Sequence, residues 1–168
     1  MKNRILIPLM ALVISGCFSD EPTPKSVTLT SSEVTSLLPR EVIQFEKNLE
    51  LSGRLPHHYE SDYQKPHLVR LHEASVFFRE KVSELEQAHT KKMISLDRKI
   101  LDAKKAEIDA GIISESPKTT LLRELVREKN ISESEHKKGV KMLKRKERER
   151  IQFLNEQYLS VLKSDFSS

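Results

Sequence analysis

The chain lacks tryptophan and has one cysteine, four glycines and only 5% aromatic residues among its 168 residues. A single thiol excludes an intramolecular disulfide, so packing alone must hold the fold together. Scarce aromatic residues and 32% charged residues leave little apolar volume for a thick globular core. The composition favours long helices that share a narrow apolar seam.

The sequence also lacks an apolar run long enough to cross a bilayer as a helix. The longest run, residues 5–14, is about half of the ~20 residues that a transmembrane helix needs, and it contains Pro8. Lys2 and Arg4 precede this run and small residues follow it, which is the layout of an export signal. We therefore expect residues 1–16 to be a cleaved leader.

The one cysteine stands directly after this leader. The sequence Ile14-Ser15-Gly16-Cys17 resembles the lipobox of bacterial lipoproteins. The resemblance implies that the Cys17 thiol carries a diacylglycerol, that the leader is removed, and that the new amino terminus is acylated with a fatty acid such as palmitate. Because each buried methylene contributes ~0.8 kcal/mol, three acyl chains would fix the protein to a membrane essentially permanently. Phe18 stands where family members kept in the inner membrane often have aspartate, which implies a place in the outer membrane of the bacterial cell envelope.

The charge balance changes when the leader is removed. The full chain has 29 Lys and Arg against 25 Asp and Glu, a net charge of +4. Without Lys2 and Arg4 the count is 27 against 25, a net charge of +2, so the basic character belongs partly to the leader. Residues 17–38, which follow, are rich in Ser, Thr, Pro and charged residues. We expect them to form a flexible tether.

A short amphipathic helix is expected at residues 39–52. Pro39 suits a first helical turn, and Gly53 ends the helix. Four apolar residues recur at helical spacing: Leu38, Val42, Phe45 and Leu49. A polar connector, residues 57–65, follows.

A much longer helix is expected at residues 66–110. Its inward positions step by alternating fours and threes, as in the seam of a coiled coil. One additional step of four after His89 unwinds the supercoil locally. The seam positions are Leu71, Ser75, Phe78, Val82, Leu85, His89, Met93, Leu96, Ile100 and Ala103. At 1.5 Å per residue this helix would be ~68 Å long, and it needs a second helix to cover its seam.

The covering helix is expected at residues 117–165, after a turn at Gly111. Its later seam positions are Val140, Leu143, Ile151, Leu154, Tyr158 and Val161. We expect a break near residues 130–132, because Asn130 can take a left-handed cap position and Ser132 is spaced from Glu135 as in a capping box. The expected fold is therefore all-α: an elongated antiparallel helical hairpin, or coiled coil, on a flexible, lipid-anchored tether.

The region of this break resembles the short C-terminal (SHOCT) domain, a small helix–turn–helix often proposed to mediate association. The resemblance is carried by Leu122-x-x-Leu125, Asn130-Ile131-Ser132-x-x-Glu135 and Lys141-x-Leu143. That family usually has glycine before the isoleucine and an aromatic residue after the glutamate, where this chain has Asn130 and His136. The resemblance implies helical self-association.

Basic residues concentrate in the final helix, and five of them form a candidate patch: Lys137, Lys141, Lys144, Arg145 and Arg148. One interpretation is a surface for an anionic partner, such as a nucleic-acid backbone or anionic lipid. The other is the solvated face of a long helix with i,i+4 ion pairs. No aromatic residues interleave for base stacking, which favours the solvated face over nucleic-acid binding.

Neither a metal site, a cofactor nor an enzymatic activity is expected. His67 and His72 are five residues apart, which splays them around a helix, and a seam histidine such as His89 is more typical of a pH-sensitive contact than of a ligand. A rod has no concave pocket to desolvate a pair of carboxylates. The chain also has no glycine-rich phosphate loop, and its one thiol is assigned to lipid.

The layout as a whole resembles plasmid-encoded entry-exclusion lipoproteins: a lipobox leader, a short tether and a charged, nearly all-helical body of similar size. The resemblance implies a non-enzymatic protein that reduces conjugative uptake of a related plasmid by steric contact at the envelope. One alternative is an envelope assembly, membrane-bridging or lysis lipoprotein whose coiled coil binds a partner protein. Another is a small hydrolase or inhibitor on a lipid anchor. The expected partners are a membrane, through the N-terminal lipid, and either a second copy or another protein.

Overall fold

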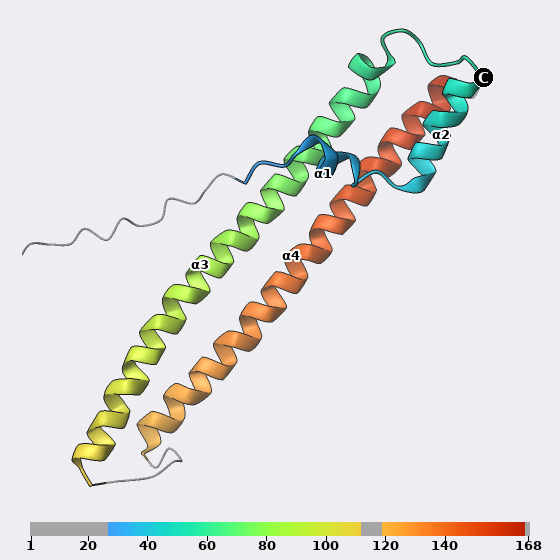
Figure 1. Ribbon diagram of the computed structural model, residues 1–168. Helices are drawn as coiled ribbons and strands as arrows, with labels where there is room; N and C mark the ends of the chain where they lie inside the picture. The colour runs from blue at the N-terminus through green and yellow to red at the C-terminus, as the bar shows by residue number, and fades with distance from the viewer. Residues whose placement is uncertain (1–26, 112–118, 167–168) are drawn as a thin grey trace, which may run out of the picture.

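The computed structural model describes residues 27–111 and 119–166, and every regular element in these ranges is a helix. Two long helices, α3 (Lys65–Asp109) and α4 (Thr120–Phe166), lie antiparallel and form a hairpin (Figure 1). At 1.5 Å per residue α3 is ~68 Å long. The elongated, all-α hairpin predicted from the sequence is confirmed.

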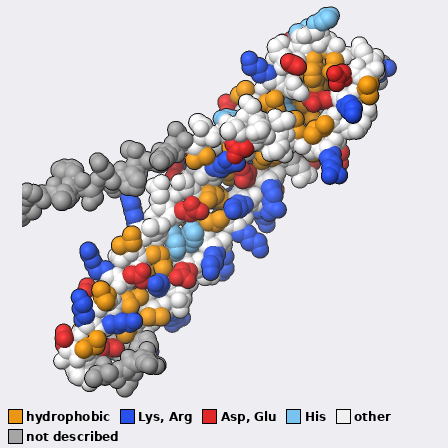
Figure 2. All heavy atoms as spheres, in the orientation of Figure 1, with side chains coloured by type: hydrophobic (Ala, Val, Ile, Leu, Met, Phe, Trp, Pro, Cys, Tyr) orange, Lys and Arg blue, Asp and Glu red, His pale blue; other side chains and the backbone are white. Residues whose placement is uncertain are grey.

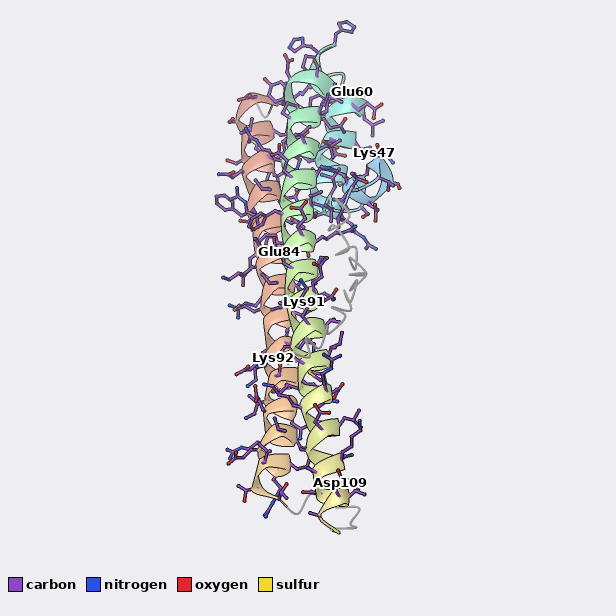
Figure 3. All side chains as sticks on the ribbon, turned by 90° about the vertical axis from the view of Figure 1, so that its left-hand side faces the viewer. Lys47, Glu60, Glu84, Lys91, Lys92 and Asp109 are labelled. Atoms are coloured by element: carbon purple, nitrogen blue, oxygen red, sulfur yellow. The ribbon has the colours of Figure 1, made fainter. Side chains whose placement is uncertain are left out.

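Three shorter elements pack near the end of the hairpin where α3 begins and α4 ends. They are α1 (Ser31–Thr35), α2 (Arg40–Leu51) and a π-helical turn, η1 (Glu60–Gln64). We call this end, residues 40–67 with residues 154–166, the head. A view turned by 90° shows α1 and α2 on the same side of the two long helices (Figure 3).

The seam of α3 follows the predicted spacing along its whole length. All ten predicted positions are buried or half-buried, with Leu71 0% and Leu96 2% exposed. Glu107 continues the rhythm as a buried residue and accepts a hydrogen bond from the backbone N–H of Thr119 at 2.8 Å. The step of four after His89 is therefore accommodated without any break in α3.

The seam of α4 agrees with the prediction except at its last position. Val161 is 45% exposed, whereas Leu162 is 0% exposed. The reason is that α2 covers this end of α4, and Leu162 packs against Val42 and Tyr158 there. The inward direction of α4 is thus set by two neighbours in the head and not by α3 alone.

The predicted break near residues 130–132 is wrong, because α4 is continuous through this region. In the described residues only glycines have positive φ, so Asn130 does not take a left-handed cap. Ser132 is buried against α3, and Lys129 forms an ion pair with Asp97 at 2.7 Å. Packing on α3 outweighs the local capping signals, and no helix–turn–helix forms in this part of α4.

The predicted tether, residues 17–38, is partly wrong. Its first ten residues lie outside the described ranges, but residues 27–38 pack on the hairpin. Thr30 and Glu33 form a capping box that starts α1, and Val34 is buried against Leu71 and Leu154. The prediction rested on the polar composition of this segment, but a few apolar side chains are enough to make this contact.

The short helix predicted at residues 39–52 is observed one residue shorter at each end. Pro39 precedes its first turn, and Gly53 follows it with a φ of 68°, in the left-handed region that favours glycine. The connector that follows was predicted to be polar throughout. It contains η1, and directly before η1 lies Tyr59, which is 5% exposed and belongs to the core of the head.

Candidate functional site

A cluster of three short oxygen contacts joins the parts of the head. Tyr59 and Tyr158 each donate to Oε1 of Glu46 at 2.7 Å, and their own hydroxyl oxygens lie 2.6 Å apart. Glu46 comes from α2 and Tyr158 from α4, while Tyr59 precedes η1. The cluster therefore ties α2 and the connector to the end of the hairpin.

Both phenols of this cluster stay protonated over the whole physiological range. Burial, together with the carboxylate of Glu46, raises the pKa of Tyr59 and of Tyr158 well above the ordinary value of 10. Two phenolic protons are thus available for three contacts when Glu46 is ionised. The arrangement suits a structural clamp, because neither phenol can ionise to act as a base.

A second polar contact lies beside the first. His67 of α3 is 4% exposed, stacks on the Tyr158 ring at 4.1 Å between centroids, and bonds through Nε2 to Oδ1 of Asn155 at 2.8 Å. Asn155 uses its amide N–H₂ to donate to the Leu37 carbonyl at 3.1 Å, so its oxygen must face the histidine. Nε2 of His67 therefore carries the proton in the neutral ring, and the second proton would go to Nδ1.

The environment of His67 disfavours that second proton. Burial lowers the pKa of His67 below its ordinary value of 6.5, against the opposing effects of the Asn155 hydrogen bond and the charge of Glu46. The head is consequently built around a neutral imidazole.

A third polar contact lies near the middle of the hairpin. His89 of α3 and His136 of α4 stack with ring centroids 4.1 Å apart and an interplanar angle of 6°. One turn away α4 has Gly139, where an added Cβ would lie 2.9 Å from Cδ2 of Leu85. The helices approach closely here because glycine leaves space for a leucine from α3.

The histidines are dispersed along the hairpin. In the described ranges, no group of three His, Cys, Asp or Glu side chains is arranged to hold a metal ion. His67 and His72 do not converge: His67 faces Asn155 of α4, and His72 is half-buried elsewhere on α3. The polar side chains that the structure does bring together act on helix packing.

Four of the five residues in the predicted basic patch project from the same side of α4, and the fifth does not. Lys137, Lys141, Lys144 and Arg148 recur at steps of four, three and four, so they project from α4 within about 60° of one another. We call these four exposed residues the basic stripe. Arg145 projects to the side and forms an ion pair with Glu149 at 3.1 Å. Among the described residues, the three lysines of the stripe have no ion-pair partner.

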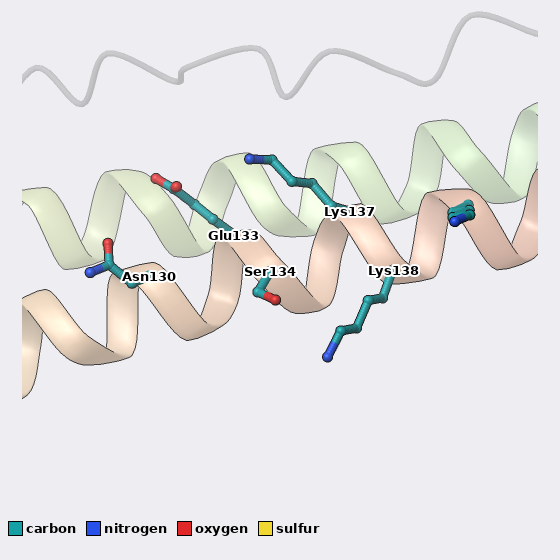
Figure 4. A pocket seen from close by; sticks show the side chains of 6 residues that line it. Asn130, Glu133, Ser134, Lys137 and Lys138 are labelled. Carbon is teal, nitrogen blue, oxygen red and sulfur yellow. The ribbon is translucent and has the colours of Figure 1, made fainter.

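A shallow hollow on α4 begins this stripe. It is lined by Asn130, Glu133, Ser134, Lys137, Lys138 and Lys141. Lys137 and Lys138 leave the helix on different sides, so the hollow follows one convex helix (Figure 4). Such a surface can attract an anion by charge, but it does not enclose one.

Sequence reasoning identified the basic residues and missed the head cluster. Tyr158 was predicted in the seam of α4. His67 and Asn155 are polar residues that are buried on helix faces otherwise occupied by apolar residues, and such residues are expected to hydrogen-bond to one another. Glu46 and Tyr59 gave no such signal, because their burial depends on contacts 112 and 99 residues away.

The proposed lipidation site, Cys17, lies outside the described residues. Within the described ranges, none of the helices contains an apolar stretch that could span a membrane. Comparison of the chain with protein-family models, with curated proteins and with solved structures finds no match.

Proposed function

We propose that the protein is a lipid-anchored, non-enzymatic envelope protein that lowers conjugative entry of a related plasmid by contact. The observation that carries this proposal is the combination of the lipobox-like Ile14–Cys17 segment with a long helical hairpin whose buried polar groups serve packing. The protein would act through its exposed surface, held at one membrane.

The dimensions of the hairpin support a steric mode of action. A rod of ~68 Å covers much more membrane surface, or reaches much further from it, than a compact domain of the same mass. With several acyl chains on Cys17, the rod would not leave the membrane on the timescale of a mating contact. Occupation of the envelope by many such rods would obstruct an incoming transfer apparatus or DNA.

Mating assays test this proposal. Recipient cells would carry the wild-type gene, a Cys17→Ala variant or an empty vector, and donors would transfer either a related or an unrelated conjugative plasmid. We expect the wild-type gene to lower uptake of the related plasmid only, and the Cys17→Ala variant to behave as the empty vector although its hairpin is intact.

Equal uptake in all three recipients would overturn the proposal. Unchanged uptake accompanied by lysis on expression, or by co-purification of one subunit of an envelope machine, would assign the protein to envelope assembly or lysis. Incorporation of labelled palmitate into the wild-type protein but not into the Cys17→Ala protein would establish the anchor separately from exclusion.

A further inference from the structure

We propose that the hairpin lies along the membrane surface with the face that carries α1 turned toward anionic lipid headgroups. This inference rests on the lipid anchor of the proposed function. We call this side the front face. It is the side on which Arg79 of α3 meets Glu33 of α1 at 3.4 Å, and on which Val34 packs.

The point at which the chain joins the hairpin favours this orientation. Val27, the first described residue, leads into Leu29 and α1, which pack on the front face beside Leu71 of α3 and not beyond either end of the rod. Nine residues separate it from Cys17, and their fully extended length is ~35 Å, about half of the ~68 Å rod. The anchor therefore holds the rod by its side and keeps the front face near the bilayer.

The basic stripe lies on this face. Lys144 is seven residues before Ile151, which places the two side chains within about 20° of each other around α4. Ile151 packs in the cluster beneath α1. Figure 2 shows Lys and Arg side chains gathered along the middle of α4 on the side where α1 lies.

An apolar stripe accompanies it on the far half of α3. Ile94, Leu101 and Ile108 recur every seven residues and are 65%, 53% and 63% exposed. They project within about 60° of the direction of Arg79, and hence toward the front face. Hydrophobic side chains are visible on this part of α3 in Figure 2.

A basic stripe beside exposed aliphatic side chains fits a lipid surface. Each Lys or Arg near an anionic membrane contributes ~1 kcal/mol, and aliphatic side chains can enter the boundary between headgroups and acyl chains. The three lysines of the stripe have no ion-pair partner among the described residues, so binding to headgroups would not require the loss of an existing pair.

The opposite face carries two ion pairs. Lys81 pairs with Glu84 at 2.8 Å and Lys92 pairs with Glu128 at 3.8 Å. It also exposes Phe77 and Phe153, 53% and 47%. Their rings lie under cations, with Lys81 6.0 Å and Arg150 5.5 Å from the ring centroids. This face would remain open when the front face meets the membrane.

The test uses the processed, lipidated chain in vesicles that contain phosphatidylglycerol and phosphatidylcholine with brominated acyl chains. Because the Cys17 sulfur carries lipid, a fluorescent maleimide would label only an introduced cysteine. We expect a fluorophore at Leu101→Cys to be quenched, and a fluorophore at Met142→Cys, on the opposite face of the hairpin, to remain as bright as in vesicles without bromine.

A matched pair of charge reversals tests the basic stripe. Lys144→Glu should lower the ratio of membrane-lying to detached hairpins about fivefold or more, and so reduce quenching at position 101. Lys146→Glu changes the net charge equally but projects about 160° away around α4, and should leave quenching unchanged. Circular dichroism would verify that each variant is as helical as the parent.

Three outcomes would overturn the inference: no quenching at either label, stronger quenching at 142 than at 101, or equal effects of the two reversals. The first would indicate a rod that stands away from the bilayer, and the second would assign the opposite face to the membrane. These outcomes leave the anchor intact. A purified chain without attached lipid would instead refute the anchor, which labelled palmitate detects independently.

Discussion

Replacing Tyr158 by phenylalanine removes one oxygen from the point where α2, the connector and α4 meet. Glu46 would keep the bond from Tyr59 but lose the one from Tyr158, and it would remain partly buried. We expect Tyr158→Phe to lower the free energy of unfolding by about 1–2 kcal/mol, as measured by urea denaturation of the leaderless chain.

The control for this substitution is Tyr63→Phe. Tyr63, the one tyrosine outside the Glu46 cluster, is half-buried, and its acidic neighbour Asp165 is exposed, so loss of its hydroxyl should change stability by less than about 0.5 kcal/mol. Similar losses for the two variants would contradict the special role of the Glu46 cluster.

The neutral imidazole of His67 makes the head sensitive to acid. Its pKa is lowered by burial in the folded chain, so the unfolded chain binds the proton at higher pH than the folded chain does. Stability is therefore full above about pH 7 and falls as the pH drops through the ordinary value of 6.5 toward the folded pKa. The loss amounts to about 1.4 kcal/mol for each unit that separates the two pKa values.

Urea unfolding at pH 7.5 and pH 5.5 measures this effect, and His67→Gln isolates it. The variant keeps a donor for Asn155 and cannot take up the proton, while the other five histidines contribute equally to both proteins. We expect a smaller loss of stability on acidification in the variant. The same loss in both would show that other groups govern the acid response.

Among the elements, α4 provides the clearest test of helix continuity. Asn130 is exposed in a continuous helix, where intrinsic propensity ranks alanine above asparagine and asparagine above glycine. Asn130→Ala should therefore raise the free energy of unfolding by a few tenths of a kcal/mol, and Asn130→Gly should lower it by a similar amount. A left-handed turn at this position would reverse the order, because glycine is the preferred residue there.

Ser134, also exposed and one turn further along α4, supplies the control. Ser134 lies outside the predicted break at residues 130–132. Ser134→Ala should therefore stabilise the chain and Ser134→Gly should destabilise it, whether or not a turn exists at Asn130. Stabilisation by Asn130→Gly alone would restore the predicted break.

The contrast between α3 and α4 shows which parts of the fold can be read from the sequence. The seam of α3 repeats over ten positions, and each one reinforces the same inward direction. The predicted break in α4 depended on three capping residues whose local preference is each worth about 1 kcal/mol. Burial of Ser132 against α3 and the ion pair between Lys129 and Asp97 favour a continuous helix instead, and the sequence around residues 130–132 does not reveal these contacts.

Contacts distant in the sequence explain the other omissions. Residues 27–38 resemble a tether in composition, yet Val34 packs against Leu154, 120 residues away. Tyr59 lies in a polar connector, yet it reaches Tyr158 across the head. The basic stripe could be predicted from the sequence because its residues follow the helical period. Which ligand would bind the stripe could not be predicted, because that depends on the side of the hairpin on which α1 packs.

At the scale of the whole molecule, the property that distinguishes the hairpin from a compact domain is its length. A compact domain of about 150 residues has a radius of gyration of about 15 Å. A rod of ~68 Å has a radius of gyration of at least about 20 Å from its length alone. We expect small-angle X-ray scattering of the leaderless Cys17→Ser chain to give the larger value.

The mass measured in the same experiment distinguishes two ways of association. Hairpins that pair side by side would double the mass with an unchanged maximum dimension, and this would expose one face fewer for a partner. Hairpins that pair through their heads would double the mass and lengthen the particle, which would extend the reach of an anchored rod. A monomer with the radius of a compact domain would contradict the hairpin itself, and with it the proposed steric mode of action, which depends on the length of the rod.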